Sequence, residues 1–170
     1  QSLLKEMRTE GRSVVTLAAP RSRANDPRAA GKRLTADAVK LVWRSNGKDL
    51  ERAEAVGNAE LYVEPIVQNA KAYRKTLTGP RFDCDFYEVG NLARSCVSTG
   101  GTKAVLDPVE PGEKRSTRTL TSGKLSVIFA RATQDLESVE AQGNAKFNES
   151  DRNGTAANIT YTAKDDMVRL

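Results

Sequence analysis

Residues 49–63 read DLERAEAVGNAELYV, and the fold class of the chain depends on whether they form a helix or a strand. Read alone, the stretch favours a helix, because Asp49 is a suitable N-cap and Leu50 and the alanines are good helix formers. The Gly57-Asn58 pair lies in the middle of that helix, however, and the last five residues resemble a strand. The stretch by itself leaves both structures open.

Comparison of the chain with itself reveals a repeat. The segments 34–65, 77–108 and 120–151 align without a gap at a spacing of 43 residues. The shared columns are Leu34/Leu77/Leu120, Thr35/Thr78/Thr121, Trp43/Phe86/Phe129 and Gly57/Gly100/Gly143. Three ungapped copies at one period rarely arise by chance. The predicted repeat units are 34–76, 77–119 and 120–162.

The first half of each unit alternates apolar and polar side chains, which predicts a half-buried strand. The apolar positions are Val39, Leu41 and Trp43 in the first unit, Phe82, Cys84 and Phe86 in the second, and Leu125, Val127 and Phe129 in the third. A short polar segment follows in each unit (SNGKD, EVGN, RATQD) and carries the residues expected of a hairpin turn.

The second half of each unit resolves the ambiguity of residues 49–63. Alternate positions are small or apolar in all units: Ala53/Cys96/Val139, Ala55/Ser98/Ala141, Ala59/Thr102/Ala145 and Leu61/Ala104/Phe147. The middle copy, NLARSCVSTGGTKAVL, has poor helix propensity and good strand propensity. Since the copies should fold alike, we predict one long strand in each. The glycine column then marks a bulge or corner where that strand bends.

The two cysteines test this register. A hairpin centred near residue 90 places Cys84 opposite Cys96, with Leu41/Ala53 and Val127/Val139 as the corresponding pairs in the other units. These pairs are apolar, so the cysteines occupy interior positions. A disulfide and two buried free thiols both remain open. A disulfide would indicate an oxidising compartment such as the periplasm.

The composition argues against an enzyme. The 170 residues include no histidine, and the two cysteines are too few for a zinc site. The chain contains neither GxGxxG nor GxxxxGK[ST]. We therefore predict no catalytic residue, metal or cofactor. No segment approaches the roughly 20 apolar residues of a membrane-spanning helix. Apolar residues make up 38% of the chain and aromatics 5%, which suits a thin, layered structure.

Positive charge is concentrated in residues 21–33, RSRANDPRAAGKR, within a chain of net charge +5. One interpretation is a solvated loop, and the other is an anion-binding patch for phosphates. The candidates for such a patch are Arg21, Arg23, Arg28, Lys32 and Arg33. Nucleic acid is not an expected partner, because the aromatic residues fall mainly on the inward face of the predicted strands.

The units GNAELYV and GNAKFNE and the C-terminal TAANITYTAKDDMVRL resemble the LptA/OstA-like family, which includes LptC and the periplasmic part of LptD. Gly57-Asn58-Ala59 and Gly143-Asn144-Ala145 match its Gly-Asn-Ala strand directly. The middle copy departs from the pattern with Gly100-Gly101-Thr102. The resemblance covers about residues 34–170.

The resemblance implies an all-β, antiparallel β-jellyroll shaped like a taco shell and built from the repeated hairpins. It further implies a non-enzymatic role in lipopolysaccharide transport in the periplasm. The acyl chains would lie in a groove between two sheets, and other jellyrolls of the same type would dock on the exposed edge strands. We expect a single repeat-built domain over residues 1–170, as an internal stretch of a longer array. Attachment to the inner or outer membrane through further parts of the chain would be compatible with this.

The groove would be lined by the inward side chains of the repeats. The candidates are Val39, Leu41, Trp43, Ala53, Ala55, Leu61, Val63, Phe82, Phe86, Leu125, Val127, Phe129 and Phe147. The same residues could instead fill a closed core, and the pattern does not separate the two. A β-solenoid scaffold that assembles through its edge strands, without lipid, is the alternative function.

Overall fold

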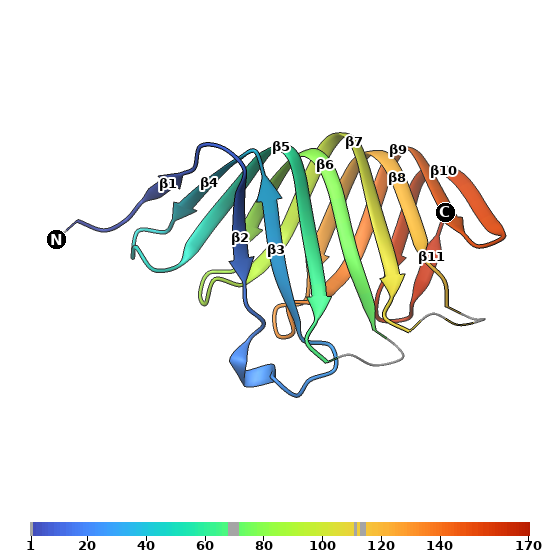
Figure 1. Cartoon of the computed structure of the whole chain (residues 1–170), viewed down its shortest axis with the longest axis horizontal. Helices are drawn as coiled ribbons and strands as arrows, with labels where there is room; N and C mark the ends of the chain where they lie inside the picture. Colours follow the sequence, from blue (N-terminus) through green and yellow to red (C-terminus); the bar gives the residue numbers. More distant parts are fainter. Residues whose placement is uncertain (1, 68–71, 111, 113–114) are drawn as a thin grey trace.

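The computed structural model describes residues 2–67, 72–110, 112 and 115–170, so the ends of the first two predicted repeat units lie partly outside the described residues. The described chain forms one antiparallel sheet of 11 strands (Figure 1). Its helical content is a single 3-10 turn, η1 (Arg21–Arg23). The all-β prediction is confirmed, and the helix interpretation of residues 49–63 is wrong.

The strands are β1 (Glu6–Arg8), β2 (Ser13–Leu17), β3 (Ala30–Ala36), β4 (Ala38–Trp43), β5 (Leu50–Pro65), β6 (Tyr73–Phe86), β7 (Ala93–Pro108), β8 (Arg118–Phe129), β9 (Leu136–Glu149), β10 (Arg152–Thr162) and β11 (Met167–Arg169). Neighbours in sequence are mostly neighbours in the sheet. The long strand β5 is shared, because its first half pairs with β4 and its second half with β3.

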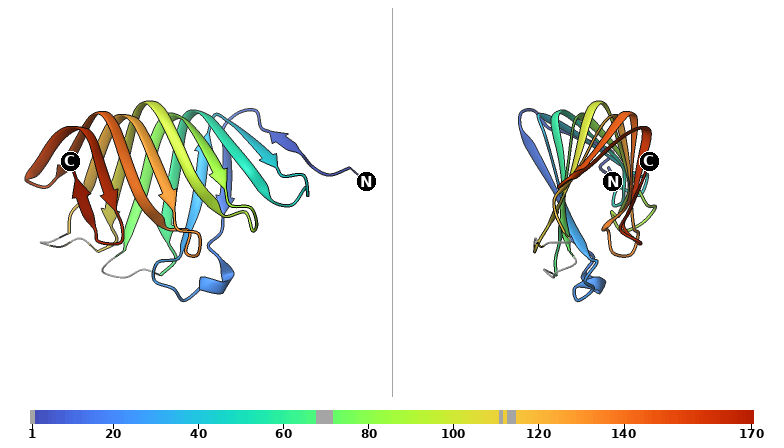
Figure 2. Two further views of the ribbon diagram at one scale, coloured as in Figure 1. Left: turned by 180° about the vertical axis from the view of Figure 1, so that it is seen from behind. Right: turned by 90° about the vertical axis from the view of Figure 1, so that its right-hand side faces the viewer.

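The sheet bends over a common crest and descends on both sides, as the end-on view in Figure 2 shows. We call the two sides the front wall and the rear wall. The front wall comprises residues 13–17, 30–36, 59–65, 73–78, 102–108, 118–121, 145–149 and 152–156. The rear wall comprises residues 6–8, 38–43, 50–56, 81–86, 93–99, 124–129, 136–142, 158–162 and 167–169. The β-jellyroll prediction is confirmed.

The crest follows the predicted glycine column. The pairing of β5 with β6 shifts register between Val56 and Ala59, and the other long strands shift at equivalent points. The backbone has positive φ at two successive residues of each corner, Gly57-Asn58, Gly100-Gly101 and Gly143-Asn144. Glycine and asparagine tolerate this conformation best. The Gly-Asn pair that contradicts a helix is thus the corner of a bent strand.

The first unit differs from the others at the crest. Its first strand is split into β3 and β4 at Asp37, whereas β6 and β8 continue across the corner. Asp37 accepts hydrogen bonds from Asn58 Nδ2 (3.0 Å) and Arg12 Nη1 (3.2 Å). A Cβ added at Gly57 would lie 2.6 Å from Asp37 Oδ2, so this corner has no room for a side chain. The predicted loop over residues 21–33 is also too long, because β3 begins at Ala30.

The predicted cross-strand register is confirmed. Leu41 lies opposite Ala53, and Cys84 lies opposite Cys96. In the third unit Val127 lies opposite Val139. The inward side chains of both walls form one hydrophobic core beneath the crest.

Replacing Gly143 by alanine should lower the free energy of unfolding by about 1–2 kcal/mol, because the backbone there is left-handed (φ 79°). Urea unfolding of the variant measures this. Gly123 is the matched control, because it lies beside Gly143 at the crest, with its Cα 3.9 Å from the position that a Cβ at Gly143 would take. A Cβ at Gly123 itself would make only ordinary contacts, at 3.7 Å. Equal losses in Gly143→Ala and Gly123→Ala would contradict the corner's role.

Candidate functional site

The structure places the predicted groove residues on the inner faces of the two walls. All are buried except Trp43, which is partly buried against the same core. Trp43 ends β4, where the pairing with β5 shifts register after Val42, and it lies near the edge of the rear wall. Its equivalents Phe86 and Phe129 lie deeper in the sheet and are buried.

Large and small side chains alternate across the rear wall. The large ones come from β4, β6 and β8 (Val39, Leu41, Phe82, Phe86, Leu125, Val127, Phe129), and the small ones come mainly from β5, β7 and β9 (Ala53, Ala55, Ser98, Ala141). Neighbouring strands lie about 5 Å apart, so each small residue leaves space beside a large one.

Side chains of the opposite wall fill most of that space in this structure. A cavity of about 20 Å³ lies between the walls, room for about one water molecule. It is lined from the front wall by Val15, Leu17, Lys32, Leu34 and Leu61, and from the rear wall by Leu41, Ala53, Cys84, Phe86, Ala93, Cys96 and Phe129. The two walls are therefore in contact, and the interior is a packed core in this conformation.

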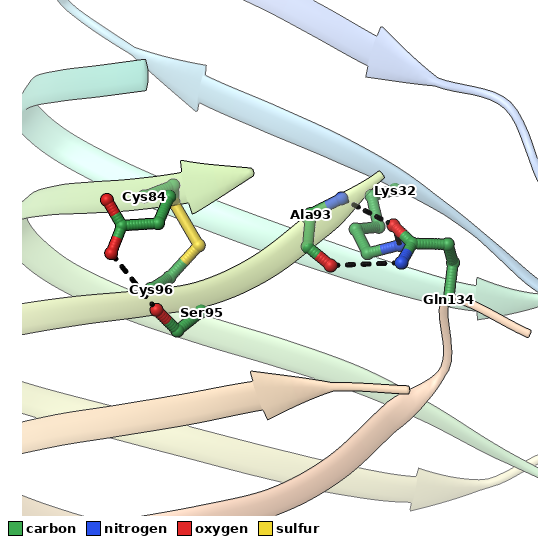
Figure 3. Close-up of a disulfide and its surroundings, with 7 residues drawn as sticks. Lys32, Cys84, Ala93, Ser95, Cys96 and Gln134 are labelled. Atoms are coloured by element: carbon green, nitrogen blue, oxygen red, sulfur yellow. Dashed lines mark hydrogen bonds between the residues drawn. A yellow bond between two sulfur atoms is a disulfide. The ribbon is translucent and has the colours of Figure 1, made fainter. Parts of the chain in front are cut away.

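A disulfide joins Cys84 to Cys96 at this cavity (Figure 3). It links β6 to β7 within the rear wall, at cysteines that are both buried. The described residues contain no free cysteine. The cross-link holds the pairing of two long strands beside the place where the walls meet.

The β8–β9 turn, residues 130–135, crosses from the rear wall to the front wall. Ala30 N donates a hydrogen bond to Thr133 O (3.1 Å), and Lys75 Nζ forms an ion pair with Asp135 Oδ1 (2.6 Å). Gln134 is buried within the same turn. These contacts bridge the mouth of the folded sheet, opposite the crest.

Gln134 organises this bridge, as Figure 3 shows. Its Nε2 donates to Ala93 O (2.9 Å), and its Oε1 accepts from Ala93 N (2.7 Å). The same oxygen accepts from Lys32 Nζ (3.0 Å), which reaches it from β3. Sequence reasoning missed Gln134, because a glutamine in a polar turn carries no signal of burial.

Lys32 lies inside the molecule. Burial lowers the pKa of its ammonium group to about 7, and the nearby Asp135 carboxylate offsets only part of this effect. The ammonium nitrogen lies 4.8 Å from the centroid of the Phe129 ring, a cation–π contact between the walls. A buried lysine beside an aromatic ring makes this part of the mouth sensitive to pH.

The predicted anion patch is not assembled as one surface. Arg21, Arg23 and Arg28 are exposed in the segment below the front wall, and Arg23 pairs with Asp26. Arg33 is exposed on the outer face and stacks on Tyr62 at 5.0 Å, whereas Lys32 points inward. Successive residues of a strand face opposite sides of the sheet, which separates these last two cations.

Within the described residues, no group of three or more cysteine, aspartate or glutamate side chains could hold a metal ion. That part of the chain also contains no helix long and apolar enough to cross a membrane.

Replacing both Cys84 and Cys96 by valine should lower the free energy of unfolding by about 2–3 kcal/mol, because the disulfide closes a segment with a sequence separation of 12. Valine reproduces the Val127/Val139 pair of the third unit, so packing is largely kept. Denaturant unfolding with and without reductant measures the effect. Reductant should destabilise the parent chain and leave the double variant unchanged; equal stability of both proteins would contradict the expectation.

Lys32 should make stability rise with pH. The pKa of Lys32 is about 7 in the folded protein and 10.5 in the unfolded chain. Between these two pH values the unfolded chain binds one more proton than the folded protein, so the free energy of unfolding rises with pH. Relative to Lys32→Met, the unfolding free energy of the parent chain should rise by about 2 kcal/mol between pH 7 and 9. The charged groups nearby are Asp135 and Lys75, and both are kept in the variant. A difference that does not change with pH would contradict this.

Three comparisons with known proteins bear on this architecture. Residues 113–170 match the model of the family described as LptA/(LptD N-terminal domain) LPS transport protein. A comparison with curated protein sequences gives no match. Among solved structures, the chain is similar to LptH, described as the LptA homologous periplasmic component of the conserved lipopolysaccharide transport device from Pseudomonas aeruginosa. That similarity has a TM-score of 0.55 and 15% identity, and it covers 82% of this chain and 80% of LptH.

The similarity to LptH concerns the fold, and the family match concerns the sequence of the C-terminal third. The periplasmic location expected from the resemblance is also that of LptH. Residues 113–170 thus match the LptA/(LptD N-terminal domain) family in sequence, and the larger part of the chain is similar to LptH in fold.

Proposed function

We propose that this chain is a non-enzymatic segment of a periplasmic lipopolysaccharide bridge, and that it holds acyl chains between its two walls. One observation carries the proposal: the inner faces of a folded sheet form one apolar cluster, bordered by polar side chains at the mouth. The matching family and LptH are both described as lipopolysaccharide transport proteins, which supports the proposal.

The energetics favour an alkyl ligand. Each methylene group moved from water into an apolar lining contributes about 0.8 kcal/mol. The lining here consists of leucine, valine, phenylalanine and alanine side chains from both walls. Because these side chains now touch one another, loading requires the walls to move apart. The contacts of the β8–β9 turn with the front wall, made by Thr133, Gln134 and Asp135, would then open.

The free strand edges suit end-to-end assembly. At one end, β2 pairs with β3 and β1 pairs with β4, and at the other end β11 pairs with β10. Each of these terminal strands has one neighbour in the described sheet, so its other edge can accept a further strand. We infer that other β-jellyroll proteins of this type pair with these edges and extend the lining from one protein to the next.

A scaffold without lipid is the second candidate. The packed interior, with its cavity of about 20 Å³, is the observation that favours it. Such a scaffold would use the same free edges, but its walls would stay closed.

A photo-crosslinking side chain at position 129 should form an adduct with bound lipopolysaccharide, because Phe129 lies on the inner face and is buried. A second probe at Trp43, which is partly buried, guards against misfolding of the first variant. Ile128 is the matched control: it is adjacent to Phe129, points outward and is 45% exposed. Mass spectrometry of the irradiated samples detects the adducts.

Adducts at positions 129 and 43 but not at position 128 would support the groove. Adducts confined to position 128 would contradict it. Native mass spectrometry showing lipid-free oligomers that form with rising concentration, together with no inner adduct, would favour the scaffold.

A further inference from the structure

Three cations occupy the same position in successive repeats. Lys32, Lys75 and Arg118 are spaced 43 residues apart. Lys32 and Lys75 both lie opposite Val63, and Lys75 and Arg118 both lie opposite Leu106. They therefore form one row across the inner face of the front wall, with neighbours two strand spacings, or about 10 Å, apart. We call these three residues the cation row.

The cation row is buried. Lys32, Lys75 and Arg118 are only 4%, 5% and 9% exposed. Burying an ammonium or guanidinium group is costly, and an apolar side chain of similar size would usually fill such a site at lower cost. The inward positions two residues nearer the crest show this, because they are Leu34, Leu77 and Leu120. Three cations at one depth, in three repeats, indicate a use other than filling the core.

The acceptors that now hold the cation row come largely from the opposite wall. Lys32 donates to Gln134 and Lys75 pairs with Asp135, both in the β8–β9 turn. The described residues place no carboxylate in salt-bridge contact with Lys32. If the walls separate to admit acyl chains, both lysines lose these partners while still inside the mouth.

Arg118 follows the same pattern at the other end of the row. Its Nη1 pairs with Asp166 Oδ1 (2.5 Å) in the β10–β11 turn, and its Nε pairs with Glu149 of its own wall (3.0 Å). Glu149, which also pairs with Arg152 (2.6 Å), stays beside Arg118 when the walls separate. Arg118 therefore loses only Asp166, whereas the two lysines lose the partners described above.

An unpartnered donor lies beside the row. The Tyr73 hydroxyl is buried, and among the described residues it has no hydrogen-bond partner. The Arg118 guanidinium lies 5.6 Å from the centroid of the Tyr73 ring. A buried hydroxyl without a partner is costly, so it marks a place where an acceptor is missing.

We propose that the cation row, with the Tyr73 hydroxyl, binds the phosphate groups of an acylated lipid whose chains enter the space between the walls. This inference rests on the proposed function and adds the headgroup chemistry that the site selects. The cations border the apolar lining, so a ligand that satisfies both must carry alkyl chains and an anion within one molecule. Charge-assisted hydrogen bonds to phosphate oxygens replace those to Gln134, Asp135 and Asp166.

Binding of two matched lipids to the whole chain tests the inference. The probes are an acylated disaccharide carrying two phosphates (lipid A) and the same lipid without its phosphates; inorganic phosphate is a third probe. The parent chain should bind the phosphorylated lipid about tenfold more tightly than the stripped lipid. Lys32→Met and Lys75→Met should reduce this preference severalfold, and Lys32→Arg should retain it. Lys103→Met is the matched control, because Lys103 is exposed on the outer face of β7.

Each outcome bears on one proposal. Equal affinity of the parent chain for both lipids would overturn the cation row as a binding site and leave the groove intact. Binding of neither lipid would contradict the proposed function itself. Tight binding of inorganic phosphate, with no advantage for the phosphorylated lipid, would assign the row to a free anion and overturn the proposal. Should the methionine variants fail to fold, the comparison of the two lipids on the parent chain still decides.

Discussion

The left-handed corners of β5, β7 and β9 fold one sheet into two facing walls. At Gly57-Asn58, Gly100-Gly101 and Gly143-Asn144 the backbone takes positive φ at two successive residues. The inward positions keep the same parity on both sides of the corner, as Ala55 and Ala59 show. One face of a single sheet therefore lines both walls. Without these corners the apolar face of the sheet would have no second wall to pack against.

The folded sheet creates an asymmetry between crest and mouth. At the crest the long strands run from one wall into the other, so the backbone itself joins the walls. The crest is also tightly packed in the first unit, where a Cβ at Gly57 would collide with Asp37. At the mouth they meet through turns and polar side chains, including the bridge from Lys32 to Gln134. In the proposed function, an amphiphile would enter at the mouth, with its chains inside and its headgroup among the charges.

Much of the fold could be predicted from the sequence. Three aligned copies identify residues 49–63 as a strand, because NLARSCVSTGGTKAVL in the second copy cannot favour a helix. The same alignment predicts the pairing of Cys84 with Cys96 and the inward position of Phe129. These inferences succeed because periodicity and pairing register within a hairpin are local properties.

The polar part of the site was harder to predict. Lys32 sits among basic residues, and its neighbours Arg28 and Arg33 suggested one exposed patch. Only the position at which β3 begins shows that Lys32 and Arg33 face opposite sides. Gln134 belongs to a turn that looks solvated, and its burial depends on where that turn meets the front wall.

The repeat, the strands, the corners and the side chains that point inward all follow from spacing along the chain, so they can be inferred without coordinates. The separation of the two walls and the polar contacts across the mouth, in contrast, depend on the three-dimensional fold. Those contacts join residues far apart in sequence, such as Lys32 with Gln134 and Arg118 with Asp166, and no local pattern records them. These contacts depend on how far apart the bends of all the long strands hold the two walls, and this separation is a property of the whole sheet.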